Sequence, residues 1–449
     1  MSANLAPILD RLVEADVAGI TIVWADNNGI PRSRTVPIAG LSDAAERGVG
    51  MSPLFAVYDS HDGISFAHAG LSDASGDIRL VPVIEQLVPL AGQPGFAWAP
   101  GRQLGPNGEP YPYDQRSRLE AQVARATAAG LSVRAGFELE FFVSRAGDEP
   151  VPAQQGPAYG PFALLQVDEF AAAVLRDLAA NGVPVGQFHA EYGLSQLEVS
   201  LGPADAVTAA DRQLLARQTI HAAARAHGLR VSFSPMVTAD GAGNGLHLHV
   251  SVSRGGDNLL ADQGQGLPDG DGARFIGGLL RDLPAIAAVS APSLPSLMRR
   301  RPGYFASAYQ FWGVENREAP LRYVPSSPFI GTDRANVELK ASDASGNPYL
   351  ALAAVLAAGL AGIDDDAELP PPVQEDPGTW SDVQRAERGI VPLPVTPEEQ
   401  ERALLASKRI GDALGEPLLG AFTAVRRADA AWAADRSAEE TIAAHRWRY

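Results

Sequence analysis

The chain has 449 residues, with 36 Lys+Arg against 53 Asp+Glu and a net charge of −17. This acidity argues against a nucleic-acid-binding surface, since phosphate contacts require Lys and Arg. The chain contains no Cys, which excludes disulfides, thiolate catalysis and Cys-ligated zinc or iron–sulfur sites.

Neither a leader nor a membrane span is expected. The first residues, Met1 to Asn4, do not begin a basic segment followed by an apolar core, so we expect no secretory signal. The longest apolar run, Tyr349 to Ile363, is too short and too rich in Gly and Ala for a bilayer span. We therefore expect a soluble, cytoplasmic protein with no membrane partner.

The first part of the chain predicts a small β-rich domain over residues 1–112. The expected elements are a helix at Ile8–Val13, strands at Ile20–Trp24 and Arg34–Val36, a loop at Gly48–Pro53, and strands at Leu54–Tyr58 and Asp77–Pro82. Asn27-Asn28-Gly29 is a hairpin signal between the first two strands, since Gly tolerates positive φ. Pro and Gly become dense between Pro89 and Pro112, which favours a domain boundary there.

Residues 113–449 predict a larger α+β domain. Expected helices are Asp114–Gly130, Val167–Ala180, Thr208–His227, Ala273–Leu283, a helix opened by Asn347-Pro348 and running to Gly362, and charged helices after Pro397. Strands are expected at Gly136–Phe142, within 187–200, and at Val231–Ser234, Leu246–Val252 and Asn336–Lys340. Asn is a good N-cap and Pro a favoured first residue, so Asn347-Pro348 is the clearest helix start.

The strand at Gly136–Phe142 carries two carboxylates on one face. Glu138 and Glu140 alternate with the apolar side chains of Phe137, Leu139 and Phe141. A pair of half-buried carboxylates is costly unless a cation offsets the repulsion, whereas exposed carboxylates on an edge strand are common. The stretch alone therefore supports a metal site and a solvated face about equally.

Three further strands repeat this design. Gln196-x-Glu198, His247-x-His249 and Glu338-x-Lys340 each place two polar side chains on one strand face. An isolated His-x-His is more often a packing feature, but its recurrence with carboxylates favours Mg²⁺ or Mn²⁺ over zinc.

Arginines in segments marked by Gly and Pro point to an anionic substrate. Arg299, Arg317 and Arg322 suit carboxylate or phosphate, although they also fit a solvated basic surface. Together with metals they favour phosphoryl transfer. The chain has neither a Walker-type loop nor a Gly-x-Gly-x-x-Gly after a strand, so any nucleotide site is not of those types.

Six motifs in order resemble the glutamine synthetase family, over nearly the whole chain. They are Gly-Phe-Glu-Leu-Glu-Phe-Phe at 136–142, His-Ala-Glu-Tyr-Gly-Leu-Ser-Gln-Leu-Glu at 189–198, Gly-Asn-Gly-Leu-His-Leu-His at 243–249, Arg-Arg-Arg-Pro-Gly-Tyr at 299–304, Glu-Asn-Arg-Glu-Ala-Pro-Leu-Arg at 315–322 and Val-Glu-Leu-Lys-Ala-Ser-Asp-Ala-Ser-Gly-Asn-Pro-Tyr-Leu at 337–350.

The resemblance implies a β-grasp-like N-terminal domain and a catalytic domain with a cupped antiparallel sheet and flanking helices. It implies a homo-oligomer, a dodecamer of two hexameric rings with active sites between subunits. It implies ATP and glutamate as substrates, two or more Mg²⁺ or Mn²⁺ ions per site, and a γ-glutamyl phosphate intermediate displaced by an amine.

The same resemblance assigns roles to individual residues. One metal would be held by Glu140, Glu191 and Glu198, and the other by Glu138, His247 and Glu338. His249, Ser251 and Arg322 would lie on the nucleotide side. Gly243, Asn244, Arg299, Arg317 and Lys340 would contact the substrate, with Arg299, Arg317 and Arg322 as the catalytic arginines.

Departures from the family pattern bear on the nitrogen donor. Glutamine synthetases have a Glu after Pro-Gly-Tyr that helps to deprotonate ammonium, whereas this chain has Phe305, and the loop Gly50–Pro53 lacks the expected Asp. Phe305 can wall a pocket for an organic amine. This looks like the γ-glutamyl–amine ligase branch, acting on a polyamine, ethanolamine or a similar amine.

Other departures concern glutamate and regulation. Asn336 and Lys340 replace the usual Arg, and Ala242 replaces a frequent Asn. Residues 389–394 lack the Tyr that is adenylylated in regulated members, so no such control is expected. The alternatives are a true glutamine synthetase using ammonia, a catalytically decayed ring-forming homologue, and a carboxylate/His metallo-hydrolase, which does not account for the arginine segments.

Overall fold

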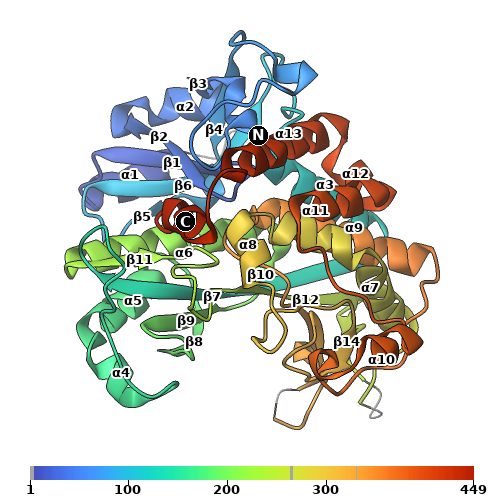
Figure 1. Ribbon diagram of the computed structural model, residues 1–449. Helices are drawn as coiled ribbons and strands as arrows, with labels where there is room; N and C mark the ends of the chain where they lie inside the picture. Colours follow the sequence, from blue (N-terminus) through green and yellow to red (C-terminus); the bar gives the residue numbers. More distant parts are fainter. Residues whose placement is uncertain (1–4, 263–265, 330) are drawn as a thin grey trace.

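Two β-sheets and a set of packed helices form the molecule (Figure 1). The computed structural model describes residues 5–262, 266–329 and 331–449. The segment Met1–Asn4, on which the expectation about a secretory signal depends, lies outside the described residues. The predicted α+β class is confirmed.

The N-terminal part of the chain, up to Leu104, is built on a six-stranded sheet in the order β2-β1-β6-β4-β3, with β5 paired to β6. Its elements are α1 (Ala6–Glu14), β1 (Gly19–Ala25), β2 (Pro31–Pro37), α2 (Leu41–Arg47), β3 (Val49–Met51), β4 (Ile78–Pro82), β5 (Val88–Pro89) and β6 (Phe96–Leu104). The predicted hairpin is confirmed, because β1 and β2 pair antiparallel on either side of the Asn27-Asn28-Gly29 turn.

Two predictions in this part of the chain are wrong. The expected strand Leu54–Tyr58 is the 3₁₀ helix η2 (Pro53–Val57), begun by Ser52, whose Oγ accepts the backbone N–H of Leu54 at 3.2 Å. The expected loop Gly48–Pro53 contains β3. The Pro- and Gly-rich stretch between Pro89 and Pro112 contains β6, for which no strand was expected; it pairs with both β1 and β4. The domain boundary at residue 112 stays a prediction.

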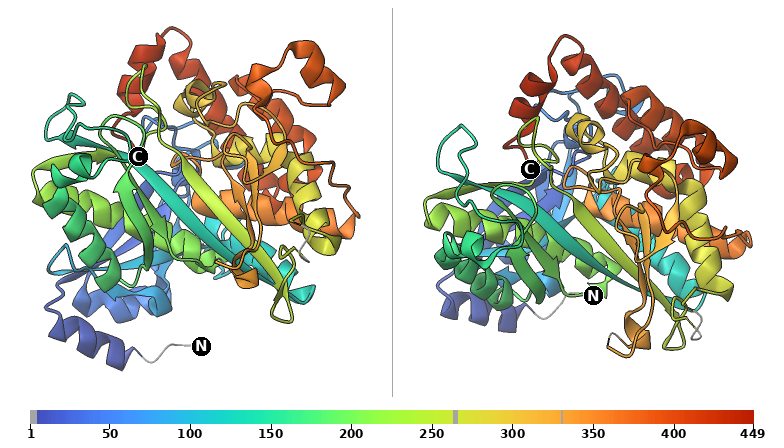
Figure 2. Two further views of the ribbon diagram at one scale, coloured as in Figure 1. Left: turned by 90° about the horizontal axis from the view of Figure 1, so that it is seen from below. Right: turned by 60° about the horizontal axis from the view of Figure 1, so that its bottom comes forward.

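A ten-stranded sheet carries the polar motifs. Its main order is β14-β15-β16-β12-β7-β9-β8, with β10 and β11 paired to β7 and β13 paired to β12. The strands are β7 (Leu131–Arg145), β8 (Val185–Ala190), β9 (Gln196–Leu201), β10 (Ala204–Asp205), β11 (Leu229–Ser232), β12 (Leu246–Arg254), β13 (Asp257–Asn258), β14 (Trp312–Val314), β15 (Leu321–Val324) and β16 (Asn336–Leu339). Within the described residues of this ten-stranded sheet, all strand pairs are antiparallel except β14 with β15, and the sheet is mainly antiparallel, as predicted. The long strands β7 and β12 run side by side through the molecule (Figure 2).

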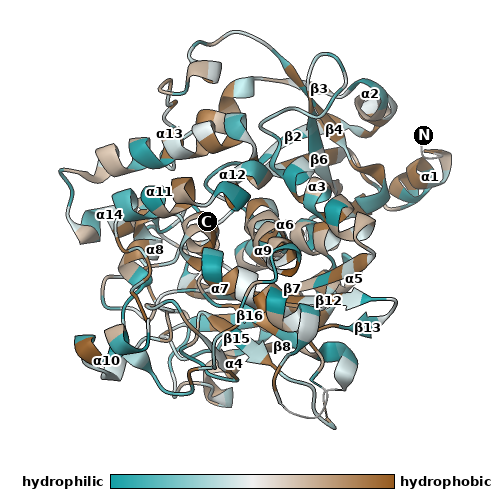
Figure 3. Ribbon diagram, turned by 90° about the vertical axis from the view of Figure 1, so that its right-hand side faces the viewer, coloured by the Kyte–Doolittle hydropathy of each residue, from teal (hydrophilic) through white to brown (hydrophobic). Residues whose placement is uncertain are grey.

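Helices cover this sheet and fill the interior. They are α3 (Gln115–Ala128), α4 (Pro161–Leu165), α5 (Asp168–Ala180), α6 (Ala206–Ala226), α7 (Gly270–Ser290), α8 (Leu294–Arg299), α9 (Pro348–Asp364), α10 (Asp382–Glu387), α11 (Pro397–Ala406), α12 (Lys408–Leu414), α13 (Glu416–Ala433) and α14 (Ala438–His445). In Figure 3, helices in the centre of the view, around the labels α6 and α9, carry many brown, apolar residues. Helix α9 is buried from Pro348 to Gly362, which explains its continuous apolar sequence. No helix in the described residues is long and apolar enough to cross a membrane.

The predicted start of α9 is confirmed, and its cap residue Asn347 links this helix to the N-terminal sheet. The Asn347 Oδ1 accepts the backbone N–H groups of Tyr349 and Leu350 at 3.0 and 3.2 Å. The same side chain donates from Nδ2 to the carbonyls of Ala25 and Asp26, both at 3.0 Å. Gly29, at the hairpin turn, faces the 344–346 backbone, where a Cβ would lie 2.8 Å from the Ala344 carbonyl. The turn of the hairpin is therefore packed against the segment that leads into α9.

Candidate active site

The floor of the site is the face of β7 that carries Glu138 and Glu140. The alternate side chains Phe137, Leu139 and Phe141 are buried on the opposite face, as predicted. Apolar packing on one side thus fixes the direction of the carboxylates on the other.

Strand register brings a histidine and a third carboxylate beside Glu138. His247 on β12 is the cross-strand partner of Glu138, and Glu338 on β16 is the partner of His249. The His247 Nδ1 lies 3.6 Å from Glu138 Oε2 and 3.4 Å from Glu338 Oε1, and the His249 Nε2 lies 3.5 Å from Glu138 Oε1. Motifs far apart in sequence therefore meet on one sheet face.

A second group of polar side chains comes from β8 and β9, along the edge of β7 that is not paired with β12. Glu198 on β9 is opposite Glu140, and His189 on β8 is opposite Glu198. The His189 Nε2 lies 3.4 Å from Glu191 Oε1 and 3.7 Å from Glu198 Oε1. His189 was not among the predicted ligands. The signal was present, because His189-x-Glu191 has the same spacing as the other pairs.

In the described residues, three sets of ligand atoms lie close enough to hold a metal ion. The atoms in each set are within 4.8 Å of one another, and the sets are Glu138/Glu198/His247, Glu138/His249/Glu338 and His189/Glu191/Glu198. Glu140 is outside these sets. Its Oε2 accepts the Gln196 amide at 3.0 Å and the Gly245 N–H at 2.8 Å, and its Oε1 lies 3.6 Å from His247 Nε2. All six predicted metal ligands share the site, but their division between two ions stays a prediction.

The electrostatics of the site fit a divalent cation. Burial, followed by the charges of Glu138, Glu140 and Glu191, raises the pKa of Glu198 to about 9. Protein groups alone therefore leave this carboxyl uncompensated. Oxygen-rich sets with one or two imidazoles suit Mg²⁺ or Mn²⁺, whose bound charge would favour the ionised form of each carboxylate.

Opposite shifts occur around Glu338. Burial would raise the pKa of Glu338, but the charges of Lys340, His249 and His247 lower it to about 2. Burial would lower the pKa of His249, but the Glu138 carboxylate 3.5 Å away and the charge of Glu338 raise it to about 9. This side of the site consequently holds charged partners already in contact.

Cationic side chains border the carboxylates. The Arg322 Nη1 donates to Glu338 Oε2 at 3.0 Å, and the Lys340 Nζ lies 3.7 Å from Glu338 Oε1. The Arg322 Nε is buried without a hydrogen-bond partner in the described residues, so the guanidinium has unused donor capacity. Arg299, at the end of α8, is buried and donates from Nη1 to the Ser342 carbonyl at 3.3 Å.

The remaining predicted residues vary in their distance from this centre. Arg317 is exposed on the loop between β14 and β15, and Ser251 lies further along β12, opposite Arg134. Asn244 is buried, and its Nδ2 donates to the Ser234 carbonyl at 2.8 Å while its Oδ1 accepts the Gln196 amide at 2.9 Å. Gly243 has φ +80°, which favours glycine. Their substrate roles stay predictions.

Phe305 lies on the loop that follows α8, in a left-handed backbone conformation, with φ +51° and 58% of its surface exposed. Its backbone N–H donates to Glu318 Oε1 at 3.2 Å. Glu318 was not singled out from sequence, because only the loop arrangement brings residues 305 and 318 together.

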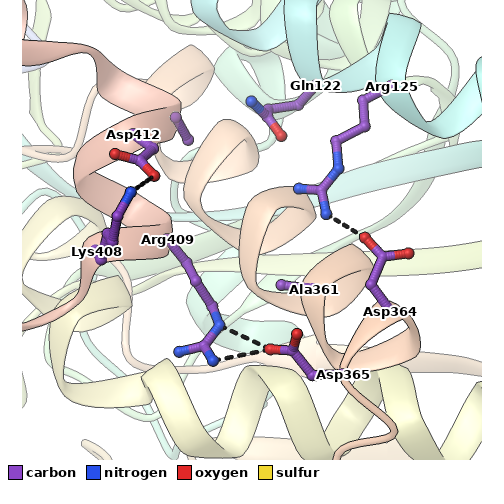
Figure 4. Close-up of a pocket in the computed structure, with 9 residues that line it drawn as sticks. Gln122, Arg125, Ala361, Asp364, Asp365, Lys408, Arg409 and Asp412 are labelled. Atoms are coloured by element: carbon purple, nitrogen blue, oxygen red, sulfur yellow. Dashed lines mark hydrogen bonds and ion pairs between the residues drawn. The ribbon is translucent and has the colours of Figure 1, made fainter.

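A separate hollow of about 430 Å³ contains none of these residues (Figure 4). It is lined by ion pairs between α3, the end of α9 and α12: Arg125–Asp364 at 2.6 Å, Arg409–Asp365 at 2.8 Å and Lys408–Asp412 at 2.5 Å. Each of these cations already has a carboxylate partner, so the hollow is a solvated ion-pair network.

Sequence comparisons agree with the motif order. Residues 112–443 match the family model for the glutamine synthetase catalytic domain. The gamma-glutamylpolyamine synthetase GlnA3 of Streptomyces coelicolor is 42% identical over 444 residues, covering 98% of this chain and 95% of that protein. A glutamine synthetase of Pyrococcus horikoshii is 31% identical over 405 residues, covering 88% of this chain and 86% of that protein.

Solved structures have the same fold. A crystal structure described as a novel glutamine synthase homolog superposes with a TM-score of 0.86 at 31% identity, covering 96% of this chain and 99% of that one. A structure described as a GmaS/ADP complex superposes with a TM-score of 0.84 at 26% identity, covering 96% of this chain and 97% of that one.

Proposed function

The chain belongs to the glutamine synthetase family, and from this membership we propose that it is an ATP-dependent ligase that joins glutamate to an organic amine. The proposal depends above all on Phe305, an apolar side chain at the position where the family's ammonia-using members carry an acid. The 42% identity to a gamma-glutamylpolyamine synthetase supports the same choice.

The reaction has two steps. A γ-carboxylate oxygen of glutamate attacks the terminal phosphorus of ATP, forming γ-glutamyl phosphate and releasing ADP. The amine nitrogen then attacks the acyl carbon, the carbon–oxygen bond to phosphate breaks, and the nitrogen loses a proton to give the amide. Bound Mg²⁺ or Mn²⁺ would supply charge neutralisation for the phosphates.

The chain's own residues would orient the reactants. Arg299 is buried beside the sheet and would hold the substrate carboxylate through its guanidinium fork. Arg322 and Arg317 would bind the transferred phosphoryl group, and Arg322 has a free buried Nε for that purpose within the described residues. Glu138, Glu140, Glu191, Glu198, His247 and Glu338 would hold the metals, with His189 as an additional candidate. His249 and Ser251 would lie toward the nucleotide.

We also propose the finer properties that the family suggests. These are a homo-oligomer, most simply a dodecamer of two rings, a cytoplasmic location where ATP is available, and no control by adenylylation. Light scattering of the purified protein tests the assembly.

The decisive assay is phosphate release with glutamate and ATP across ammonia, ethanolamine, alkylamines, polyamines and anilines. We expect turnover with at least one organic amine and weak use of ammonia. Saturation by ammonia at low concentration, with no ADP formed from the amines, would instead identify a glutamine synthetase. Failure to bind Mn²⁺ or ATP in calorimetry would support a non-catalytic homologue.

A further inference from the structure

Three loop segments meet beside Phe305, and Glu318 lies among them. The Glu318 N–H donates to Asn316 Oδ1 at 3.0 Å, and the Asn316 Nδ2 donates to the Val373 carbonyl at 2.9 Å. Gly378 packs so close to Pro302 that a Cβ on it would lie 3.3 Å from the Pro302 Cβ. The loops at 302–305, 316–318 and 373–378 are thus held together, and the Glu318 carboxylate reaches the Phe305 N–H from within them.

The negative charge of Glu318 has no ion-pair partner in the part of the chain that the structure describes. Burial and, next, the like charge of Asp376 raise the pKa of the half-buried Glu318 carboxyl. Lys340 opposes this shift, but its Nζ lies nearer the sheet, 3.7 Å from Glu338. The one hydrogen bond from Phe305 leaves most of the acceptor capacity of the carboxylate available.

An uncompensated carboxylate next to an exposed aromatic ring has the chemistry to bind an alkylammonium ion. Methylene groups can pack on the Phe305 ring while the ammonium group donates to the carboxylate, a charge-assisted hydrogen bond. Residue 305 itself has no acid, so in this chain the anion comes from a neighbouring segment.

The position of Glu318 favours a nitrogen that does not react. The reacting nitrogen must approach the acyl phosphate near the metal-site carboxylates. Glu318 lies on the loop between β14 and β15, and its carboxylate accepts the Phe305 N–H. In the described residues, no hydrogen bond or ion pair joins its side chain to those of the proposed metal ligands on the sheet. A cation bound at Glu318 is therefore separated from the centre of the reaction.

We propose that Glu318 is a specificity-determining residue that binds the second, non-reacting ammonium group of a diamine or polyamine substrate. The inference rests on the proposed function and narrows the class of amine substrate. An alkylamine with a neutral tail has no second cation and would form no ion pair with Glu318.

The test compares n-butylamine with 1,4-diaminobutane in the wild-type enzyme and in Glu318→Gln. Gln keeps an oxygen that accepts the Phe305 N–H and removes only the charge. In Glu318→Gln we expect the KM for 1,4-diaminobutane to rise at least about tenfold, with kcat within about twofold. The reason is that a hydrogen bond between two charged groups is stronger than one to a neutral amide. Turnover of n-butylamine should be unchanged. Glu315→Gln is the matched control, because Glu315 is exposed on the same loop and carries the same charge.

Several outcomes would overturn the inference. They are an equal loss with both amines, no change with 1,4-diaminobutane, or the same loss in Glu315→Gln. A wild-type enzyme that uses another organic amine but not 1,4-diaminobutane would also overturn it. One that uses no organic amine of the panel would instead refute the proposed function, so the two failures are distinguishable. A second measurement needs no variant: raising KCl should increase the KM of the wild type more for 1,4-diaminobutane than for n-butylamine, and equal increases would contradict the proposal.

Discussion

Gly245 lies directly against the guanidinium of Arg299. A Cβ atom on residue 245 would be 2.7 Å from Arg299 Nη2 and also 2.7 Å from His247 Nε2. Both atoms are the ends of side chains, so a methyl group there would displace functional groups before it moved the backbone. The absence of a side chain at 245 therefore determines where the arginine and the histidine can sit.

Gly245→Ala should impair substrate binding while leaving the fold intact. We expect the KM for glutamate to rise at least about tenfold, because small displacements of positioning groups have large effects. The melting temperature should stay within about 4 °C of wild type. In Gly411→Ala, within α12, the new Cβ would meet Leu419 Cδ2 at an ordinary 3.5 Å, so this control should be fully active. Unaltered kinetics in Gly245→Ala would contradict the placement of Arg299.

Glu338→Gln should abolish ADP formation. Glu338 is 2% exposed, and its carboxylate lies within ion-pair distance of Arg322, Lys340 and His247. The amide of Gln removes the negative charge with which these side chains pair. We expect a loss of at least about 100-fold in ADP release, in line with the removal of charged groups from other active sites. Calorimetric melting checks that the protein is folded. Turnover near the wild-type rate would show that Glu338 is not a metal ligand.

Metal binding should release a proton from Glu198. With its pKa raised to about 9, this carboxyl is protonated at neutral pH in the metal-free protein, and a cation must displace that proton. Mn²⁺ affinity should therefore increase with pH up to about 9, by at most tenfold per pH unit for one proton. Calorimetric titrations in buffers of different ionisation enthalpy count the proton. Glu198→Gln should bind Mn²⁺ more weakly and lose this pH dependence; a wild-type affinity independent of pH would refute the assignment.

Asn347→Ala should lower the free energy of unfolding by about 2–4 kcal/mol. The substitution removes the cap of α9 and two buried hydrogen bonds to the carbonyls of Ala25 and Asp26. Urea denaturation measures the change. Asn107, which accepts the Glu109 N–H in an exposed turn, is the control, and its Ala variant should differ from wild type by less than about 0.5 kcal/mol. Similar losses in the two variants would contradict the linking role of Asn347.

Local signals predicted those elements whose conformation is decided locally. The alternation in Gly136–Phe142 gave the face of β7, and Asn347-Pro348 gave the start of α9. β6 escaped prediction because Pro100 and Gly101 read as a break in the chain. Within the sheet these residues pair with Val23 and Pro82, so tertiary contact overrides the local preference.

The site was predictable as far as strand periodicity reaches. Glu138, Glu198 and His247 could be placed on strand faces, but their mutual distances depend on register between strands distant in sequence. His189 acquires its partners only when β8 pairs with β9. Glu318 reaches Phe305 only through the packing of loops. Loops have no periodic pattern, so the sequence does not reveal this contact.

The buried hairpin at Gly29 has a consequence for protein engineering. A Cβ at this position would lie within 2.9 Å of the carbonyls of residues 344, 345 and 346, the segment that follows Lys340 and leads into α9. An N-terminal sheet taken from another family member would fit only if its own turn packed equally closely against the backbone of residues 344–346. Chimeras should therefore take residues 26–30 and residues 343–347 from the same parent protein, wherever the crossover point is placed.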